Sequence, residues 1–273
     1  ATGSTVCAPI DDHPPPPRPG IGRGCACSQP CRQYTLGNRA RRDAHGTITI
    51  MIMHQAASLA PKTPAWIVAI DPSSDYAGVA LFDGTQASVI AWNARHDHTV
   101  SQLGQLDHLL RVTGIDLLAL DAIAVAIGPG SFSALRVGLS IAKGLAFSLE
   151  LPVLGIPTTD AIAAQLGWTE RPVVAVMTAG RGRVVWSRYE RGALAHGPHN
   201  TTVEELRANI DGVVVAGETS ALGDLPVAPL PAGGRVEQIA RLGWDRLLAG
   251  ERDDASLLEP IYAHGRHQKA VSV

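Results

Sequence analysis

The spacing of apolar residues from about position 64 onward predicts an alternation of buried strands and helices. Short apolar runs bounded by turn residues are typical of strands, whereas leucines recurring every three or four residues are typical of helices. Asp83-Gly84 separates two of the short runs and favours a β-hairpin. The predicted strands are 66–70, 78–82, 87–92, 123–127 and 152–156, and the predicted helices are 99–113, 131–148 and 158–167.

The same order of elements begins again near residue 172. A strand, a Gly-Arg-Gly turn at 180–182 and a second strand repeat the opening hairpin. Two similar α/β lobes, each with a mixed β-sheet flanked by helices, follow from this partial duplication. We place the first lobe at 64–165 and the second at 166–273. The later predicted strands are 172–177, 184–189 and 213–216, and the later helices are 202–209 and 235–249.

Residues 1–60 have a different composition. They include a proline run at 14–17 and all four cysteines, and their apolar residues show no period. Such a segment buries too little apolar surface to offset the entropy of ordering, so we expect a disordered extension. Because Met51 lies just before the folded pattern, we expect either a gene start assigned too far upstream or an extension that is clipped. The cysteines lack the paired CxxC spacing of structural zinc sites, so no metal is expected.

The overall composition is that of a soluble globular protein. Apolar residues make up 45% and charged residues 18% of the 273 positions, and the formal net charge is −2. The chain has no strongly basic region overall, so we do not expect it to bind nucleic acid tightly by itself. Arg136 and Lys143 interrupt the longest apolar helix, so no membrane span is expected. The absence of cysteine after Cys31 favours a reducing compartment, and we expect a cytoplasmic protein.

Two turns could hold an anion. Asp71 ends the first strand, and a glycine turn at 128–130 leads into the helix that Ser131 could cap. Pro72 has no N–H group, which weakens a phosphate cradle beside Asp71. We therefore predict a degenerate nucleotide site, with tight structural turns as the alternative. Its residues are Asp71, Ser73, Gly128, Gly130 and Ser131. Catalytic and metal-binding residues are not expected, because HExxH and GxSxG motifs are missing.

Small residues recur every four positions along the helix at 131–148. Ala134, Gly138, Ala142 and Ala146 leave one face of this helix with little side-chain bulk. A helix that is apolar on all sides must be covered, either by the protein's own core or by a partner. We favour a partner, so this face is the predicted docking surface.

Three segments together resemble one family. They are IVAIDPSS from Ile67, LALDAIAVAIGPGSFSALRVGLSIAKGLA from Leu118, and LLEPIYAHG from Leu257. They are similar to the bacterial tRNA threonylcarbamoyladenosine biosynthesis family TsaB (YeaZ), over about residues 66–262. The resemblance implies an actin-like ATPase (ASKHA) fold and a non-catalytic dimerisation subunit. It also implies a TsaD-like catalytic partner, a TsaE-like ATPase subunit, and tRNA contacted through the complex.

The resemblance further implies that the helices of the first lobe form the partner interface. ATP or ADP and a metal would then belong to the partner subunits, and the free chain could form a homodimer. Two departures weaken a nucleotide role: Thr178 stands where the family has a carboxylate, and 99–113 lacks the catalytic relative's histidine pair. The expected interface residues are Leu103, Leu106, Leu110, Phe132, Leu135, Gly138, Leu139, Ala142 and Leu145.

Two other functions remain open. An ATP-dependent small-molecule kinase of the same superfold would need two acidic phosphate turns, of which the sequence supplies only Asp71. A metalloprotease of the glycoprotease-like family would need the missing histidine pair. The subunit role is therefore preferred.

Overall fold

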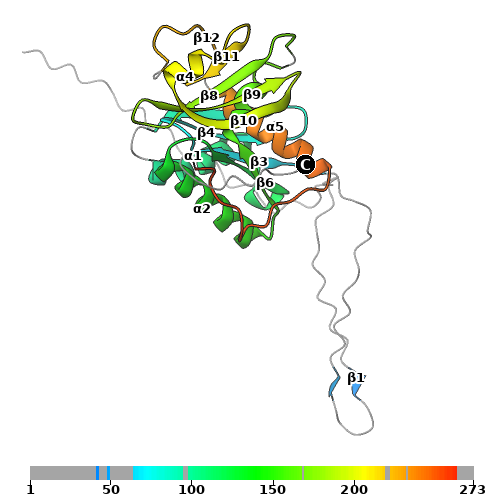
Figure 1. Cartoon of the computed structure of the whole chain (residues 1–273). Coiled ribbons are helices and arrows are strands. Elements are labelled where there is room, and N and C mark those ends of the chain that lie inside the picture. Colours follow the sequence, from blue (N-terminus) through cyan, green and yellow to red (C-terminus); the bar gives the residue numbers. More distant parts are fainter. Residues whose placement is uncertain are drawn as a thin grey trace, which may run out of the picture. The chain divides into compact units, whose positions relative to one another are not determined.

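The computed structural model describes residues 41–42, 48–49, 64–94, 98–167, 169–218, 222–231 and 233–262 (Figure 1). The chain divides into two compact units, residues 1–60 and 61–273. In the first unit, β1 (Arg41–Arg42) pairs with β2 (Ile48–Thr49) in antiparallel fashion. The rest of this unit, with its four cysteines and the segment predicted to be disordered, lies outside the described residues.

The second unit contains a first sheet with the strand order β5-β4-β3-β6-β7. The first three strands pair antiparallel and the last three pair parallel, so the sheet is mixed as predicted. Strand β3 is buried at every position, because helices cover both faces of the sheet. The strands are β3 (Ile67–Asp71), β4 (Tyr76–Phe82), β5 (Ala87–Asn93), β6 (Ala122–Gly128) and β7 (Val153–Pro157).

Helices on opposite faces of this sheet bury two separate cores. Helices α1 (His98–Thr113) and α2 (Phe132–Leu149) cover one face, where Leu106 and Leu139 pack against Val68. Helix α5 (Gly234–Leu248) covers the other face, where Ile239 packs against Ala69. A short 3-10 helix (Leu117–Ala119) leads from α1 into β6.

The second sheet has the order β10-β9-β8-β11-β12 and is also mixed. Helix α4 lies against one of its cores through Leu206, and α3 contacts strands of both sheets. The elements are α3 (Thr158–Ala164), β8 (Val173–Thr178), β9 (Arg183–Glu190), β10 (Ala193–Thr202), α4 (Val203–Arg207), β11 (Val214–Gly217) and β12 (Val227–Ala228).

Helix α5 belongs to the second half of the sequence but packs on the first sheet. Glycines allow this close approach: a Cβ at Gly78 would lie 2.7 Å from Val236, and one at Gly243 would lie 2.6 Å from Ala124. The chain therefore returns to its first sheet after completing the second. The predicted division into two consecutive lobes does not include this return.

Helix α2 alone, among the described residues, has the length and apolar composition of a membrane span. Its buried face packs against β6, as expected of a helix layered on a sheet.

Candidate functional site

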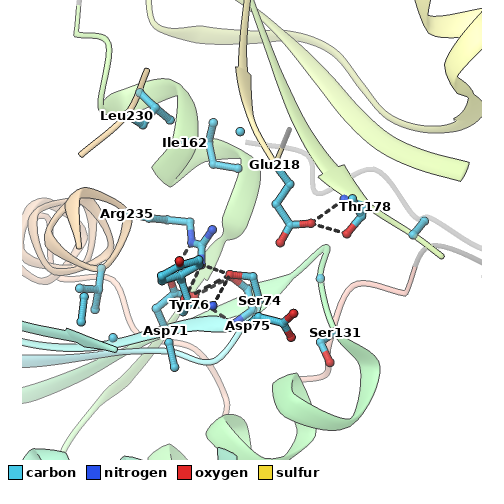
Figure 2. Close-up of a pocket in the computed structure, with 18 of the residues that line it drawn as sticks. Asp71, Ser74, Asp75, Tyr76, Ser131, Ile162, Thr178, Glu218, Leu230 and Arg235 are labelled. Carbon is cyan, nitrogen blue, oxygen red and sulfur yellow. Dashed lines mark hydrogen bonds and ion pairs between the residues drawn. The ribbon is translucent and has the colours of Figure 1, made fainter. Parts of the chain in front are cut away.

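A cleft of about 950 Å³ is enclosed by residues of both sheets and of helices α2, α3 and α5 (Figure 2). Four of the five predicted nucleotide-site residues line it, namely Asp71, Ser73, Gly130 and Ser131. Gly128 is not among its lining residues. The cleft therefore unites the two turns that the sequence singled out.

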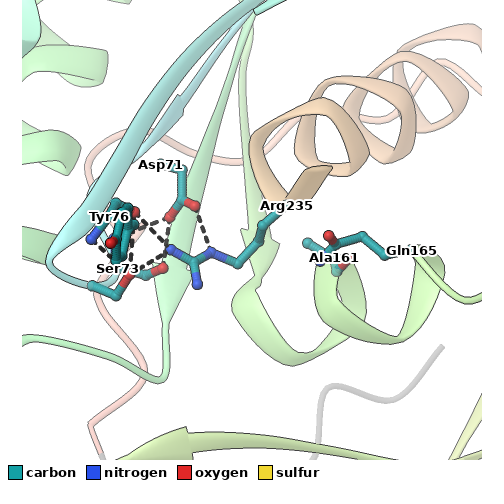
Figure 3. A network of polar contacts seen from close by, with 7 residues as sticks. Asp71, Ser73, Tyr76, Ala161, Gln165 and Arg235 are labelled. Carbon is teal, nitrogen blue, oxygen red and sulfur yellow. Dashed lines mark hydrogen bonds and ion pairs between the residues drawn. The ribbon is translucent and has the colours of Figure 1, made fainter. Parts of the chain in front are cut away.

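Asp71 lies at the bottom of this cleft with both carboxylate oxygens already hydrogen-bonded. The backbone N–H and the hydroxyl of Ser73 donate to Oδ1 at 3.0 and 2.6 Å. The Arg235 guanidinium donates to Oδ2 at 2.5 Å (Figure 3). Only 3% of the Asp71 side chain is exposed, so this carboxylate is bound within the protein rather than presented to a ligand.

Arg235 was not identified from the sequence as a site residue. It lies in the first turn of α5, and it also donates to Ser74 Oγ at 2.6 Å and to the Tyr76 carbonyl at 2.9 Å. A cation in the first turn of a helix is disfavoured by the helix dipole. A positive charge at this position of the helix therefore indicates that Arg235 needs an acidic partner. The sequence does not identify that partner, because Asp71 lies 164 residues away.

The glycines of the 128–131 turn make room for the chain's own backbone. A Cβ at Gly130 would lie 2.3 Å from the Ser73 carbonyl oxygen, and the Ser131 N–H donates to that same oxygen at 2.8 Å. A Cβ at Gly128 would lie 2.9 Å from the Ile261 carbonyl oxygen. The predicted side-chain cap by Ser131 does not form, because its hydroxyl bonds no helix N–H.

A second carboxylate lines the cleft from the other sheet. Glu218 follows β11 and accepts hydrogen bonds from the Thr178 backbone N–H, at 3.0 Å, and from the Thr178 hydroxyl. Figure 2 shows Glu218 across the cleft from Asp75 and Tyr76. The resemblance directs attention to the β8–β9 hairpin for a second acid, whereas Glu218 comes after β11, the parallel neighbour of β8.

The actin-like architecture implies ATP and a metal, and the residues at Asp71 do not fit them. A metal or a phosphate-bound metal needs free carboxylate oxygens, but the two of Asp71 are taken by Ser73 and Arg235. Within the described part of the chain, His, Cys, Asp and Glu do not gather in groups of three or more that could hold a metal.

Helix α3 links the two sheets through a buried polar contact. The Tyr189 hydroxyl of β9 donates to the Asp160 carboxylate of α3. Burial raises the pKa of Asp160, and the Tyr189 hydrogen bond and the positive charge of Arg246 oppose that rise. Burial beside the Asp160 charge also raises the pKa of Tyr189. The contact is suited to holding the sheets together rather than to catalysis.

The outer surface of α1 and α2 is the second candidate site, and the predicted interface residues divide between the surface and the interior. Leu103 and Phe132 are exposed by 48% and 54%. Leu110 and Leu145 are partly buried against the core of the first sheet. The remaining five are buried inside the subunit, so the prediction that they contact a partner is wrong: Leu106, Leu135, Gly138, Leu139 and Ala142.

The predicted docking stripe faces the protein's own core. All four of its members are buried, and a Cβ at Gly138 would lie 2.4 Å from Cγ of Pro72. These small residues let α2 approach the sheet and the Asp71 turn. Any larger side chain at Gly138 would therefore collide with Pro72.

A different set of small residues faces outward. Ser133, Ser140 and Gly144 of α2 are exposed, and a Cβ at Gly144 or at Gly104 of α1 would meet nothing within 4 Å. Phe147 is 88% exposed beside them. We call the exposed residues Leu103, Gly104, Phe132, Ser133, Ser140, Gly144 and Phe147 the outer α1–α2 face.

Comparison with known proteins connects the chain to one group. The family model of TsaD, tRNA N6-adenosine threonylcarbamoyltransferase, matches residues 89–217. The TsaB protein of Escherichia coli K12, named a tRNA threonylcarbamoyladenosine biosynthesis protein, is 35% identical over 143 residues, which is 50% of this chain and 61% of that protein. An uncharacterized protein of Mycobacterium bovis is 32% identical over 163 residues, which is 56% of this chain and 69% of that protein.

Solved structures agree with the sequence comparison. YeaZ from Pseudomonas aeruginosa superposes with a TM-score of 0.61 at 27% identity, covering 72% of this chain and 99% of that one. A second Pseudomonas aeruginosa structure, described as similar to peptidase YEAZ, has a TM-score of 0.62 at 26% identity and covers 73% and 100%. The chain spans 61% of the length of E. coli TsaB and 54% of that of the Haemophilus influenzae protein, to which it is 37% identical.

The duplicated mixed sheets, the glycine turn leading into α2 and these similarities agree. The predicted actin-like (ASKHA) α/β fold is confirmed, and the chain belongs to the TsaB (YeaZ) family.

Proposed function

We propose that this chain is the non-catalytic dimerisation subunit of a tRNA N6-threonylcarbamoyladenosine transferase complex. Its role is to support a TsaD-type catalytic subunit that modifies the adenosine next to the anticodon. The observation that carries the proposal is the outer α1–α2 face, where Leu103, Phe132 and Phe147 are exposed on a helix pair whose other side packs on the first sheet. The names of the TsaB relatives supply the reaction.

The outer α1–α2 face has the chemistry of a helix-packing interface. Gly104 and Gly144 leave room for a partner backbone to approach closely, and Phe147, which is 88% exposed, offers an aromatic side chain of the kind that anchors protein interfaces. Two helices meeting two partner helices could bury a total of about 1,600 Å², the usual size of a specific interface.

The residues of the cleft support a non-catalytic role for this chain. Both carboxylate oxygens of Asp71 are hydrogen-bonded within the protein, by Ser73 and by Arg235, so Asp71 is not poised to hold a metal-bound phosphate. In this proposal ATP, ADP and a metal are bound by the TsaD-type and TsaE-type subunits. A kinase and a metalloprotease are less well supported, since both need ligands that the described residues do not supply.

The proposal also assigns the tRNA contacts, the pairing of free chains and the location in the cell. The complex, rather than this chain, carries the tRNA contacts, and in the free protein the same face pairs two copies of the chain. The predicted cytoplasmic location fits tRNA modification. We retain residue 165 as the boundary between the two lobes in the sequence, with helix α5 of the second half packing on the first sheet.

Co-purification with the TsaD-type protein of the same organism tests the proposal. Leu103→Asp and Phe147→Asp place a charge on the outer α1–α2 face, and each should reduce capture of the partner by at least tenfold without changing the melting temperature. Leu194→Asp is the matched control, because Leu194 is exposed by 53% on strand β10. Full capture by both helix variants would contradict the proposal.

A further inference from the structure

The Arg235 guanidinium is surrounded by the kind of oxygen atoms that bind metal cations. Three acceptors converge on it: Asp71 Oδ2 at 2.5 Å, Ser74 Oγ at 2.6 Å and the Tyr76 carbonyl at 2.9 Å (Figure 2). A carboxylate, a hydroxyl and a carbonyl oxygen together are hard ligands of the type preferred by Mg²⁺, Mn²⁺ and Ca²⁺. In this protein a side-chain cation occupies the position among them.

The position of Arg235 on α5 makes this arrangement unusual. The N-terminal turn of a helix attracts anions, so a cation there gains nothing from the helix itself. The helix has no side-chain cap at Gly233, and its first turn approaches the sheet closely enough that a Cβ at Gly78 would collide with Val236. The helix is therefore seated where its first arginine reaches Asp71.

Burial makes the two charges depend on each other. The side chains of Asp71 and Arg235 are only 3% and 16% exposed. A buried charge that loses its partner is strongly destabilised, so the Asp71 carboxylate would require another cation or a proton if Arg235 were removed.

We propose that Arg235 is a built-in replacement for the divalent cation at the Asp71 turn, and that it prevents metal binding there. The oxygen ligands of a cation site are retained in the folded protein, and the guanidinium fills it permanently. Removing the guanidinium should uncover a site for a divalent cation. The inference concerns this cleft alone and does not depend on the proposed partner.

Manganese binding provides the test, because Mn²⁺ alone can be titrated against the full chain and followed by calorimetry or by loss of the free-ion resonance signal. Wild-type protein should show no site at Asp71. Arg235→Ala should gain one Mn²⁺ site that binds at least tenfold more tightly than any site in the wild type. The double variant Arg235→Ala with Asp71→Asn should lose it.

Two controls separate the guanidinium from general effects on α5. Arg241→Ala removes an ion pair with Glu237 on the same helix and should gain no Mn²⁺ site. Arg235→Lys keeps a cation near Asp71 and should bind Mn²⁺ at least tenfold more weakly than Arg235→Ala.

Melting temperatures with and without Mn²⁺ test the proposal even if the Arg235→Ala variant is less stable than the wild type. If Arg235→Ala is destabilised, added Mn²⁺ should raise its melting temperature but not that of the Asp71→Asn double variant. The proposal is overturned if Arg235→Ala neither binds Mn²⁺ nor is stabilised by it. It is equally overturned if wild-type protein binds Mn²⁺ through Asp71 as tightly as the variant does.

Discussion

The inner and outer faces of helix α2 both consist largely of small residues, yet they meet different surroundings. A Cβ at Gly138 on the inner face would lie 2.4 Å from Pro72, whereas one at Gly144 on the outer face would meet nothing within 4 Å. The inner residues bring the helix onto the sheet, and the outer ones are free to receive another surface. A period of small residues therefore indicates a close approach but does not identify what approaches.

The largest effect is expected on the inner face. Gly138→Leu should lower the free energy of unfolding by about 3 kcal/mol, because the new side chain must displace Pro72 and the turn that carries Asp71. Urea unfolding of the isolated chain measures this. A variant as stable as the wild type that had lost its partner would reverse the assignment of the two faces.

The comparison of a buried with an exposed position also applies to two carboxylates, Asp160 and Asp224, whose pKa values shift in opposite directions. Burial raises the pKa of Asp160 in the folded protein, so the folded state holds its proton more tightly and stability falls as pH rises from about 3.8 through the raised pKa. Asp160→Asn removes this cost. The stability of Asp160→Asn relative to the wild type should therefore increase with pH across that interval.

Asp224 is the matched control for that measurement. Its pKa is lowered by the Arg207 hydrogen bond, so its contribution to stability is present above about 3.8 and is lost as pH falls through the lowered pKa. Asp224→Asn should show the opposite trend with pH. Equal pH profiles for the two variants, from urea unfolding at each pH, would contradict the role of burial at Asp160.

On the outer face, stability and association should separate. Gly144→Leu should raise the free energy of unfolding by at most about 1 kcal/mol, because leucine is the better helix former and the position is open. The same change should abolish capture of the TsaD-type partner, since a bulky side chain blocks close helix packing. Thermal melting and co-purification together measure both effects, and undiminished capture would exclude Gly144 from the interface.

The smallest effect is expected from an exposed ion pair. Arg111 and Asp107 of α1 interact, but their side chains are 70% and 65% exposed. Arg111→Ala should change the free energy of unfolding by less than about 0.5 kcal/mol. A loss above 1 kcal/mol in urea unfolding would show that this surface is already packed against something in the isolated protein.

Elements with strong local patterns could be predicted from the sequence. The hairpin around Asp83-Gly84 and the helices at 98–113 and 132–149 match the predictions to within a residue or two. Strand β10 was missed, because Ala193–Thr202 is mostly exposed, contains Gly197-Pro198 and lacks apolar alternation. Its structure comes from pairing with β9 rather than from its own residues.

Four of the five predicted nucleotide-site residues line one cleft, and two other residues of that cleft were not predicted. Asp71, Ser73, Gly130 and Ser131 could be grouped because each lies at the end of an apolar strand or the start of a helix. Arg235 and Glu218 could not, because tertiary packing of α5 and the order of the parallel strands bring them to the cleft. Whether any of these residues binds a nucleotide remains a prediction.

The contact between Pro72 and Gly138 joins the turn that carries Asp71 to the buried inner face of helix α2. The proline lacks the N–H that an anion would use, and its ring occupies the groove that the missing side chain of Gly138 leaves. A change at either position alters the space available to the other. Across the sequences of this family we therefore expect the two positions to vary together, so that a wider residue at one accompanies a narrower residue at the other.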